Sequence, residues 1–346
     1  MSGSGGGKET RPDAIRGTGD AGRPRPARLA GQAWLGRLGE QGVLLAVWAG
    51  LVLLFGALAE HFLSPATFAT LAGRLPSLAV VAAGMTLVVV AGGIDLSVGS
   101  VAALSGAVFG VALVQRQWPL GAAAAAGIAV GGLAGFSSGL LVASLRLPSF
   151  LVTLGMLEIC RGLTYAVTGS RTLFLGAAID PLARPLPLLG VPATVPLALL
   201  VVLLAQGLLS RTVLGRWIVG TGANEEATRL SGIDTARVKV TVFTLSGVLA
   251  GLAGVLACAR LGSADPNAGA GLELAAIAGV VIGGTSLAGG SGSPWGSLLG
   301  VLVIATLETG LAQLGASEPL KRVVTGGAIV AAVAADGLRR RIASGG

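Results

Sequence analysis

The residues best suited to chemistry stand at a break between two long apolar segments, residues 91–100. This segment reads A-G-G-I-D-L-S-V-G-S and combines a carboxylate, a hydroxyl and three glycines: Asp95, Ser97, Gly92, Gly93 and Gly99. A broken membrane helix frees backbone groups that hydrocarbon cannot satisfy, so such breaks occur inside protein or beside water. An ionisable residue there predicts a substrate path with Asp95 as a gate. The alternative is a tight cytoplasmic turn in which Asp95 or Ser97 caps the following helix. Residue types alone do not separate the two interpretations.

A second, similar break follows later in the chain. Residues 283–291 read G-G-T-S-L-A-G-G-S and match residues 92–100 at five of nine positions. The glycines predicted to break this helix are Gly283, Gly284 and Gly290. Paired breaks in the two halves of a transporter indicate a central binding or permeation site. Coincidence is the alternative in a chain with 57 glycines. Because Thr285 and Ser286 replace Ile94 and Asp95, any duplicated site is asymmetric.

Two charges and one loop complete the predicted path. Glu158 and Arg161 are three residues apart in the apolar segment 148–168, so they share a helix face. Each alone at mid-membrane would cost at least ~2.5–3.5 kcal/mol on insertion scales. They either clamp neighbouring helices or face a water-filled path. Asn267 belongs to the turn-rich loop 261–272, which either lines an external mouth or joins two spans. The predicted path or gate residues are Asp95, Ser97, Glu158, Arg161 and Asn267.

The polar segment 210–239 predicts a short surface helix. Asn224 is placed to cap a helix from Glu225 to Leu230, which Ser231 and Gly232 would end. Two acidic residues favour its start and one basic residue its end: Glu225, Glu226 and Arg229. A helix this short is marginal alone, so we expect it to press against a partner protein.

Composition indicates the elements that position these residues. The chain has 346 residues, 53% hydrophobic and only 12% charged, with apolar runs near twenty residues along most of its length. This composition predicts an all-α, polytopic membrane helix bundle with about ten transmembrane helices. The expected spans are 42–60, 76–92, 97–115, 119–145, 148–168, 191–209, 238–260, 273–289, 294–313 and 319–335. Small-xxx-small pairs such as Gly131/Gly135 and Gly247/Gly251 predict close helix packing.

The charge distribution predicts orientation and domain limits. Residues 1–40 form a basic segment without an apolar face, which we expect to be a disordered cytoplasmic tail. A membrane-spanning domain follows at 41–337, with the segment expected to contact a partner at about 222–236, and 338–346 form a second basic cytoplasmic tail. Lys and Arg flank apolar spans and favour one side, which places both termini in the cytoplasm. The net charge of +8 therefore reflects topology and does not indicate nucleic-acid binding.

The sequence lacks the residues that several classes of protein function require. The sequence contains no G-x-x-x-x-G-K-[ST] phosphate loop, and its single histidine, His61, cannot build a His-based metal site. A G-x-S-x-G match at 135–139 has no base for serine chemistry. Cys160 and Cys258 lie in apolar segments and are expected to be buried thiols. We therefore expect that this protein is not an enzyme and that it binds no metal and no cofactor. With only 4% aromatic residues, the path should bind its substrate weakly and leave selection to another protein.

Four motifs in order resemble a known family: G-G-I-D-L-S-V-G-S, L-P-S-F-L-V-T-L-G-M-L-E-I-C-R-G-L-T, G-A-N-E-E-A-T-R-L-S-G-I, and the segment from A-D-P-N to P-W-G-S. Over residues 42–336 the chain resembles the permease subunit of bacterial monosaccharide importers of the ATP-binding-cassette (ABC) class, of the ribose, xylose and galactose type. The resemblance implies a multi-pass protein of the bacterial cytoplasmic membrane, paired with a second permease copy, an ATPase subunit and an extracytoplasmic sugar-binding protein.

The resemblance also implies roles for individual residues. It identifies 224–232 with the ATPase-coupling loop, whose residues here are Asn224, Glu225, Glu226, Ala227, Arg229 and Gly232. Thr228 replaces the second alanine of the E-A-A pattern in this loop. The implied function is inward transport of a monosaccharide driven by ATP hydrolysis in the partner. The alternatives are another small polar solute (a polyol, a nucleoside or an amino acid) and an ion-coupled secondary transporter.

Overall fold

The computed structural model describes residues 28–186 and 190–344, and their ordered elements are nearly all helices. The chain divides into two compact units, residues 1–40 and 41–346. The α-helices are α1 (Arg28–Leu58), α2 (Pro65–Val90), α3 (Val98–Gly110), α4 (Leu120–Ser144), α5 (Ser149–Thr168), α6 (Asp180–Ala183), α7 (Thr194–Arg211), α8 (Val213–Ala223), α9 (Glu225–Leu230), α10 (Thr235–Leu261), α11 (Leu272–Ile282), α12 (Pro294–Gln313) and α13 (Glu318–Ser344). A π-helical turn (Val111–Gln115) extends α3, a 3-10 turn (Gly176–Ile179) precedes α6, and β1 (Leu173–Phe174) pairs antiparallel with β2 (Ser263–Ala264).

Within the described residues, eight helices are long and apolar enough to cross a membrane. They are residues 41–58 of α1, then α2, α3 with its π-helical turn, α4, α5, α7, α10 and α12. The predicted all-helical, multi-pass bundle is confirmed. The span expected at 273–289 is wrong: α11 has 11 residues, hence a length of about 17 Å against a hydrocarbon core of about 30 Å. The segment expected at 319–335 lies within α13, which is not among the eight.

Both expected tails contain helix. Helix α1 begins at Arg28, inside the segment that we expected to be disordered, because residues 28–40 include several strong helix formers. The rest of that segment, residues 1–27, lies outside the described residues. At the other end α13 continues through the expected tail 338–346 as far as Ser344, and residues 345–346 lie outside the described part of the chain.

Helix α10 packs against α4, α2 and α3 and is central to the unit of residues 41–346. The contact with α4 is a glycine seam, as the small-xxx-small pairs predict. A Cβ added at Gly247 would lie 2.8 Å from the Cα of Gly135, and one at Gly131 would lie 2.8 Å from the Cα of Gly251. Backbones this close have no room for side chains between them, so the seam holds α4 and α10 in fixed register.

Helix α2 is buried along its second half, residues 79–90. Its valines and Met85 contact residues of α3, α10, α11 and α12 in the main hydrophobic cluster. A helix that is apolar all round belongs inside a bundle rather than at its surface. Both cysteines are buried free thiols, as expected.

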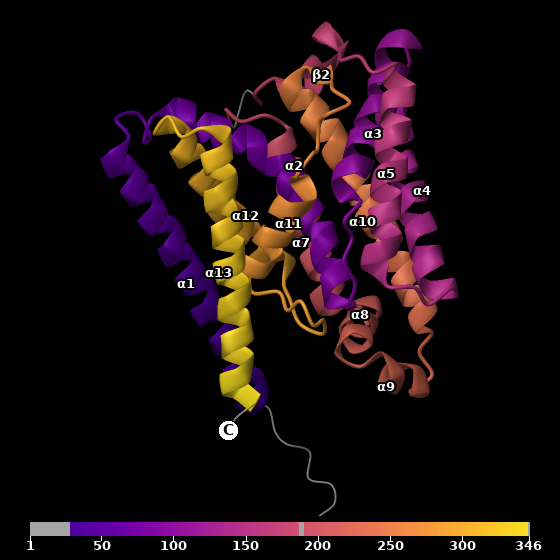
Figure 1. Cartoon of the computed structure of the whole chain (residues 1–346), viewed down its shortest axis with the longest axis vertical. Coiled ribbons are helices and arrows are strands. Elements are labelled where there is room, and N and C mark those ends of the chain that lie inside the picture. Colours follow the sequence, from indigo (N-terminus) through magenta and orange to yellow (C-terminus); the bar gives the residue numbers. More distant parts are fainter. Residues whose placement is uncertain (1–27, 187–189, 345–346) are drawn as a thin grey trace, which may run out of the picture. The chain divides into compact units, whose positions relative to one another are not determined.

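Figure 1 shows α8 and α9 at one end of these helices and β2 at the other.

Candidate functional site: two helix breaks and a short surface helix

The first break begins with a glycine-dependent stop to α2. The amide of Gly93 donates to the carbonyl of Val88 over 2.9 Å, and Gly92 adopts a φ of +82°. This 6→1 bond around a left-handed residue is a Schellman cap, which glycine adopts without steric cost. Gly99, predicted with these glycines, lies instead in the first turn of α3. There a Cβ would collide with the Glu273 carboxylate and the Gly269 carbonyl.

Asp95 fastens this break to α10. Its side chain is only 2% exposed. One carboxylate oxygen accepts from the Ser97 amide at 3.0 Å and from the Ser97 hydroxyl at 2.6 Å, and the other accepts from the Ser246 hydroxyl at 2.9 Å. Ser246 is the twelfth of 27 residues in α10, so Asp95 lies about 17 Å along that helix from its first residue. The carboxylate is therefore buried within the bundle, away from the ends of α10.

Helix α5 satisfies the other backbone groups of the first break. Ser149 and Thr153, in the first two turns of α5, accept from the amides of Ile94 and Leu96, each over 3.0 Å. Buried backbone donors without partners would cost about 1–3 kcal/mol each. The break is thus held from two sides, by hydroxyls of α5 and through Asp95 by α10.

The second break repeats the backbone of the first, but in a register one residue different from the sequence match. Gly284 has a φ of +83°, and the amide of Thr285 donates to the carbonyl of Val280, just as Gly93 does to Val88. Gly284 is therefore the backbone counterpart of Gly92, whereas the sequence match paired Gly92 with Gly283. In this register no carboxylate corresponds to Asp95. Hydroxyls link the second break to its neighbours instead, because Ser297 bonds both Thr285 and Thr86.

The two breaks meet each other and the end of α8. The amide of Gly290 donates to the carbonyl of Val90 over 2.9 Å, which joins the second break to the end of α2. Gly222, the next-to-last residue of α8, lies against both segments. A Cβ added there would overlap the Val90 carbonyl oxygen and lie 2.7 Å from the Gly290 nitrogen. We call the residues Val90, Gly92, Gly222, Gly289 and Gly290 the glycine junction.

The short surface helix forms as predicted. Asn224 caps α9 by accepting from the Ala227 amide at 2.9 Å, and Gly232 follows the helix with a φ of +84°. The buried Thr228, which stands in place of the second alanine of the E-A-A pattern, donates from its hydroxyl to the carbonyl of Asn224 over 2.9 Å. Leu230, by contrast, is 78% exposed. An exposed leucine on a six-residue helix is a candidate anchor for a partner protein.

Ion pairs fix the charged side chains of α9. Arg229 bonds Glu226 at 2.7 Å, and Lys239 of α10 bonds Glu225 at 2.7 Å. The hydrogen bond from Arg229 lowers the pKa of the Glu226 carboxyl, so this group stays ionised at neutral pH. Both pairs are on the surface and contribute little stability. Their effect is to orient the helix and the charges that it presents.

Two of the three remaining predicted path residues, Arg161 and Asn267, take part in one contact between α5 and the loop before α11. Arg161 donates to the carbonyls of Pro266 and Ala268, both at 3.2 Å, and so clamps α5 to the loop before α11. Asn267 accepts from the hydroxyl of Tyr165 at 2.8 Å. Glu158 is exposed and forms no ion pair with any described residue, so its shared helix face with Arg161 does not make them a pair.

Replacing Arg161 by Gln should loosen the loop of residues 262–271, because a shorter neutral side chain cannot bridge to both carbonyls. We expect faster amide hydrogen exchange in this loop and little change in α10. Arg171→Gln is the matched control, since Arg171 is exposed and its side chain forms no ion pair with any described residue. Equal exchange in the loop for both variants would contradict the clamp.

Several residues of this site were not predicted from the sequence. Ser246, Ser149 and Thr153 are ordinary hydroxyls within apolar helices, and only the fold brings them to the first break. Gly222 had a weak signal, because G-T-G-A-N puts two glycines at the end of a helix next to a cap. No sequence pattern indicates that it would contact residues 90 and 290.

Comparison with known proteins places the chain in a family. Residues 67–333 match the family described as branched-chain amino acid transport system / permease component. The ribose import permease protein RbsC of Escherichia coli K12 is 40% identical over 88% of this chain and 95% of its own length. The D-allose transport system permease protein AlsC of the same organism is 38% identical over 84% and 89%. The L-arabinose ABC transporter permease protein AraH of Azospirillum brasilense is 32% identical over 91% and 92%. No solved structure matches the chain.

These matches cover the breaks, the glycine junction and α9 together, and they agree with the eight apolar helices. They also agree with the expectation that this chain is a transport subunit without an ATP site of its own. The chain is a multi-pass membrane permease and belongs to the branched-chain amino acid transport system / permease component family, as its bacterial sugar-permease relatives indicate.

Proposed function

We propose that this chain forms the membrane path for inward transport of a monosaccharide, driven by ATP hydrolysis in a partner subunit. The observation that carries the proposal is the similarity along most of the chain to permeases named for ribose, D-allose and L-arabinose. All three are monosaccharides. An extracytoplasmic binding protein would deliver the sugar, which agrees with the low aromatic content of the chain. A second permease copy, identical or related, would complete it.

The proposed topology has both termini in the cytoplasm. The excess of Lys and Arg in the N-terminal segment and in residues 210–239 supports this orientation. It places α8 and α9 at the cytoplasmic end of the helices and β2 at the extracytoplasmic end. The cytoplasmic end is where an ATPase subunit must dock.

We propose that movement of the ATPase subunit is transmitted from α9 to the two helix breaks through the glycine junction. The ATPase would grip α9, whose capping residue Asn224 directly follows α8. Gly222 at the end of α8 contacts the end of α2 and the second break, so displacement of α9 would shift both. Asp95 and Ser246 would pass the movement of the first break on to α10. Tightly packed elements transmit such shifts between discrete arrangements rather than absorbing them.

The exposed leucine of α9 gives a direct test of docking. Leu230→Ser should lower the affinity of the permease for its ATPase about tenfold or more, because an apolar anchor at an interface is lost. Binding of the purified ATPase to permease in nanodiscs measures this change. Leu314→Ser, at the end of α12, is the matched exposed-leucine control. Unchanged binding by Leu230→Ser would argue against α9 as the docking helix.

The substrate class is tested by competition. Cells that carry the permease, its ATPase and its binding protein should accumulate one labelled sugar among ribose, allose, fructose and arabinose, and excess leucine should not compete. The family description makes a branched-chain amino acid the second candidate. Permease-dependent leucine uptake without sugar uptake would replace our proposal with that alternative.

A further inference from the structure

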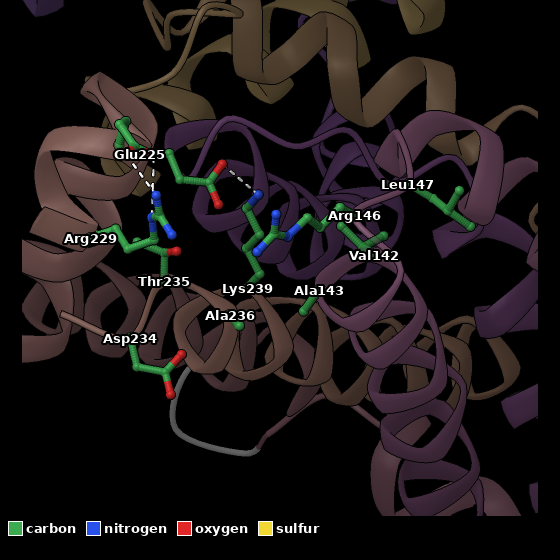
Figure 2. Close-up of a pocket in the computed structure, with 11 residues that line it drawn as sticks. Val142, Ala143, Arg146, Leu147, Glu225, Arg229, Asp234, Thr235, Ala236 and Lys239 are labelled. Atoms are coloured by element: carbon green, nitrogen blue, oxygen red, sulfur yellow. Dashed lines mark hydrogen bonds and ion pairs between the residues drawn. The ribbon is translucent and has the colours of Figure 1, made fainter.

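A cavity of about 530 Å³ lies beside α9, between the end of α4 and the start of α10. Its lining is rich in charge and includes Arg146, Glu225, Glu226, Arg229, Asp234 and Lys239. Figure 2 shows Arg146, Glu225, Arg229, Asp234 and Lys239 gathered from the three segments around one space. Nothing in the proposed path uses this cavity, although it adjoins the helix to which we assign ATPase docking.

Among the charges of this cavity, Arg146 stands apart. Glu225 pairs with Lys239, Glu226 with Arg229, and Asp234 with Arg237 at 2.9 Å. Arg146 is exposed and forms no ion pair with any described residue. Figure 2 shows its side chain beside Lys239 in the cavity.

The field of Arg146 reaches α9. The pKa of the Glu226 carboxyl is lowered first by the hydrogen bond and the charge of Arg229, and to a smaller extent by the charge of Arg146. The other five charged residues of the lining are already paired, so they leave one cation free to bind a ligand.

We propose that this cavity receives a carboxylate side chain of the ATPase subunit, which pairs with Arg146 while the rest of the interface grips α9. The inference rests on the proposed function, because it assumes that the ATPase docks at α9. A guanidinium binds a carboxylate through two parallel hydrogen bonds, which fixes orientation as well as charge. Arg146 therefore sets the register of the ATPase on the permease.

The lining favours a carboxylate over a phosphate. Glu225, Glu226 and Asp234 are each neutralised by a basic partner, so Arg146 leaves a single positive charge, and a dianionic phosphate would bring one negative charge in excess. A single carboxylate is neutralised by Arg146 alone and leaves the existing ion pairs intact. The headgroup of an acidic lipid is another anionic group that could reach Arg146 at this end of the chain. The experiment below distinguishes a lipid headgroup from a carboxylate of the ATPase.

The test measures ATPase affinity for full-length permease in nanodiscs of phosphatidylcholine alone. Arg146→Gln should raise the Kd about tenfold and weaken its dependence on salt, as the loss of an interfacial charge pair does. Arg146→Glu should raise it further, and Arg146→Lys should lie between wild type and Arg146→Gln. Arg216→Gln, an exposed arginine of α8 outside the lining, should bind like wild type. An unchanged melting temperature for the variants shows that folding is not the cause.

The outcomes distinguish this inference from the proposed function. If Leu230→Ser weakens binding and Arg146→Gln does not, the cavity inference is overturned and docking at α9 stands. If neither variant weakens binding, both are overturned. If Arg146→Gln matters only after phosphatidylglycerol is added to the nanodiscs, the occupant is a lipid headgroup and our inference is wrong. Recovery of Arg146→Glu binding by an acid-to-arginine change in the ATPase would support the proposed pair.

Discussion

Gly222→Ala is expected to reduce ATP-driven uptake to about a tenth of wild type or less. The added methyl group would occupy the position of the Val90 carbonyl oxygen, so α8 must move away from the end of α2. Such overpacking costs about 1–3 kcal/mol, and here it separates the segments that we propose to carry motion from α9 to both helix breaks. The variant should still insert in the membrane and bind the ATPase, because α9 and its cap are untouched.

Gly207→Ala is the matched control. A Cβ at this position in α7 has nothing within 4 Å, so the same chemical change meets open space. Helix propensity should even favour it, by about 1 kcal/mol. We expect wild-type uptake from Gly207→Ala, measured in the same vesicles as Gly222→Ala. Wild-type uptake by Gly222→Ala would show that the glycine junction does not transmit the movement.

Asp95→Ala is expected to abolish uptake and to lower the melting temperature. It removes the acceptor for three donors, the Ser97 amide and the hydroxyls of Ser97 and Ser246, at a buried site. Unsatisfied buried donors cost about 1–3 kcal/mol each, although the hydroxyls can turn toward other acceptors. The first break would then lose its attachment to α10.

Asp95→Asn separates stability from transport. The amide oxygen keeps one acceptor, but its bonds are neutral and about half as strong as those to a carboxylate. We expect a melting temperature between those of wild type and Asp95→Ala, lowered uptake and unchanged ATPase binding. Ser246→Ala should have a smaller effect of the same kind, because one hydroxyl is lost and the other bonds to Asp95 remain. Full uptake by Asp95→Asn would assign Asp95 to helix capping alone.

The sequence predicted local features well where a few residues decide them. The bounds of α9 agree with the prediction to the residue. Its capping residue Asn224, its acidic first turn and the terminating Gly232 lie within nine consecutive residues, so local sequence determines where the helix begins and ends. Gly92 and Gly284 likewise announce their helix breaks. The span at 273–289 failed because apolar content does not show where a buried helix stops, and α11 stops at Ile282.

Contacts between distant segments were beyond prediction from one sequence. Glu158 and Arg161 share a helix face, yet Arg161 bonds backbone carbonyls of the loop before α11, which no spacing rule anticipates. The two breaks align one residue away from their sequence match, because cap geometry rather than residue identity sets their register. Ser246, which bonds Asp95, and Ser149 and Thr153, which bond the backbone of the first break, belong to helices whose packing the sequence does not predict.

The central claim is that this permease moves a sugar at the expense of ATP in a partner subunit. Reconstitution in proteoliposomes of the permease, its ATPase and its binding protein tests this most directly, with labelled ribose, allose, fructose and arabinose supplied outside. Our account predicts that one sugar accumulates inside only when all three proteins and ATP are present, and that a proton or sodium gradient alone gives none. Accumulation driven by an ion gradient in liposomes that contain only the permease would contradict it.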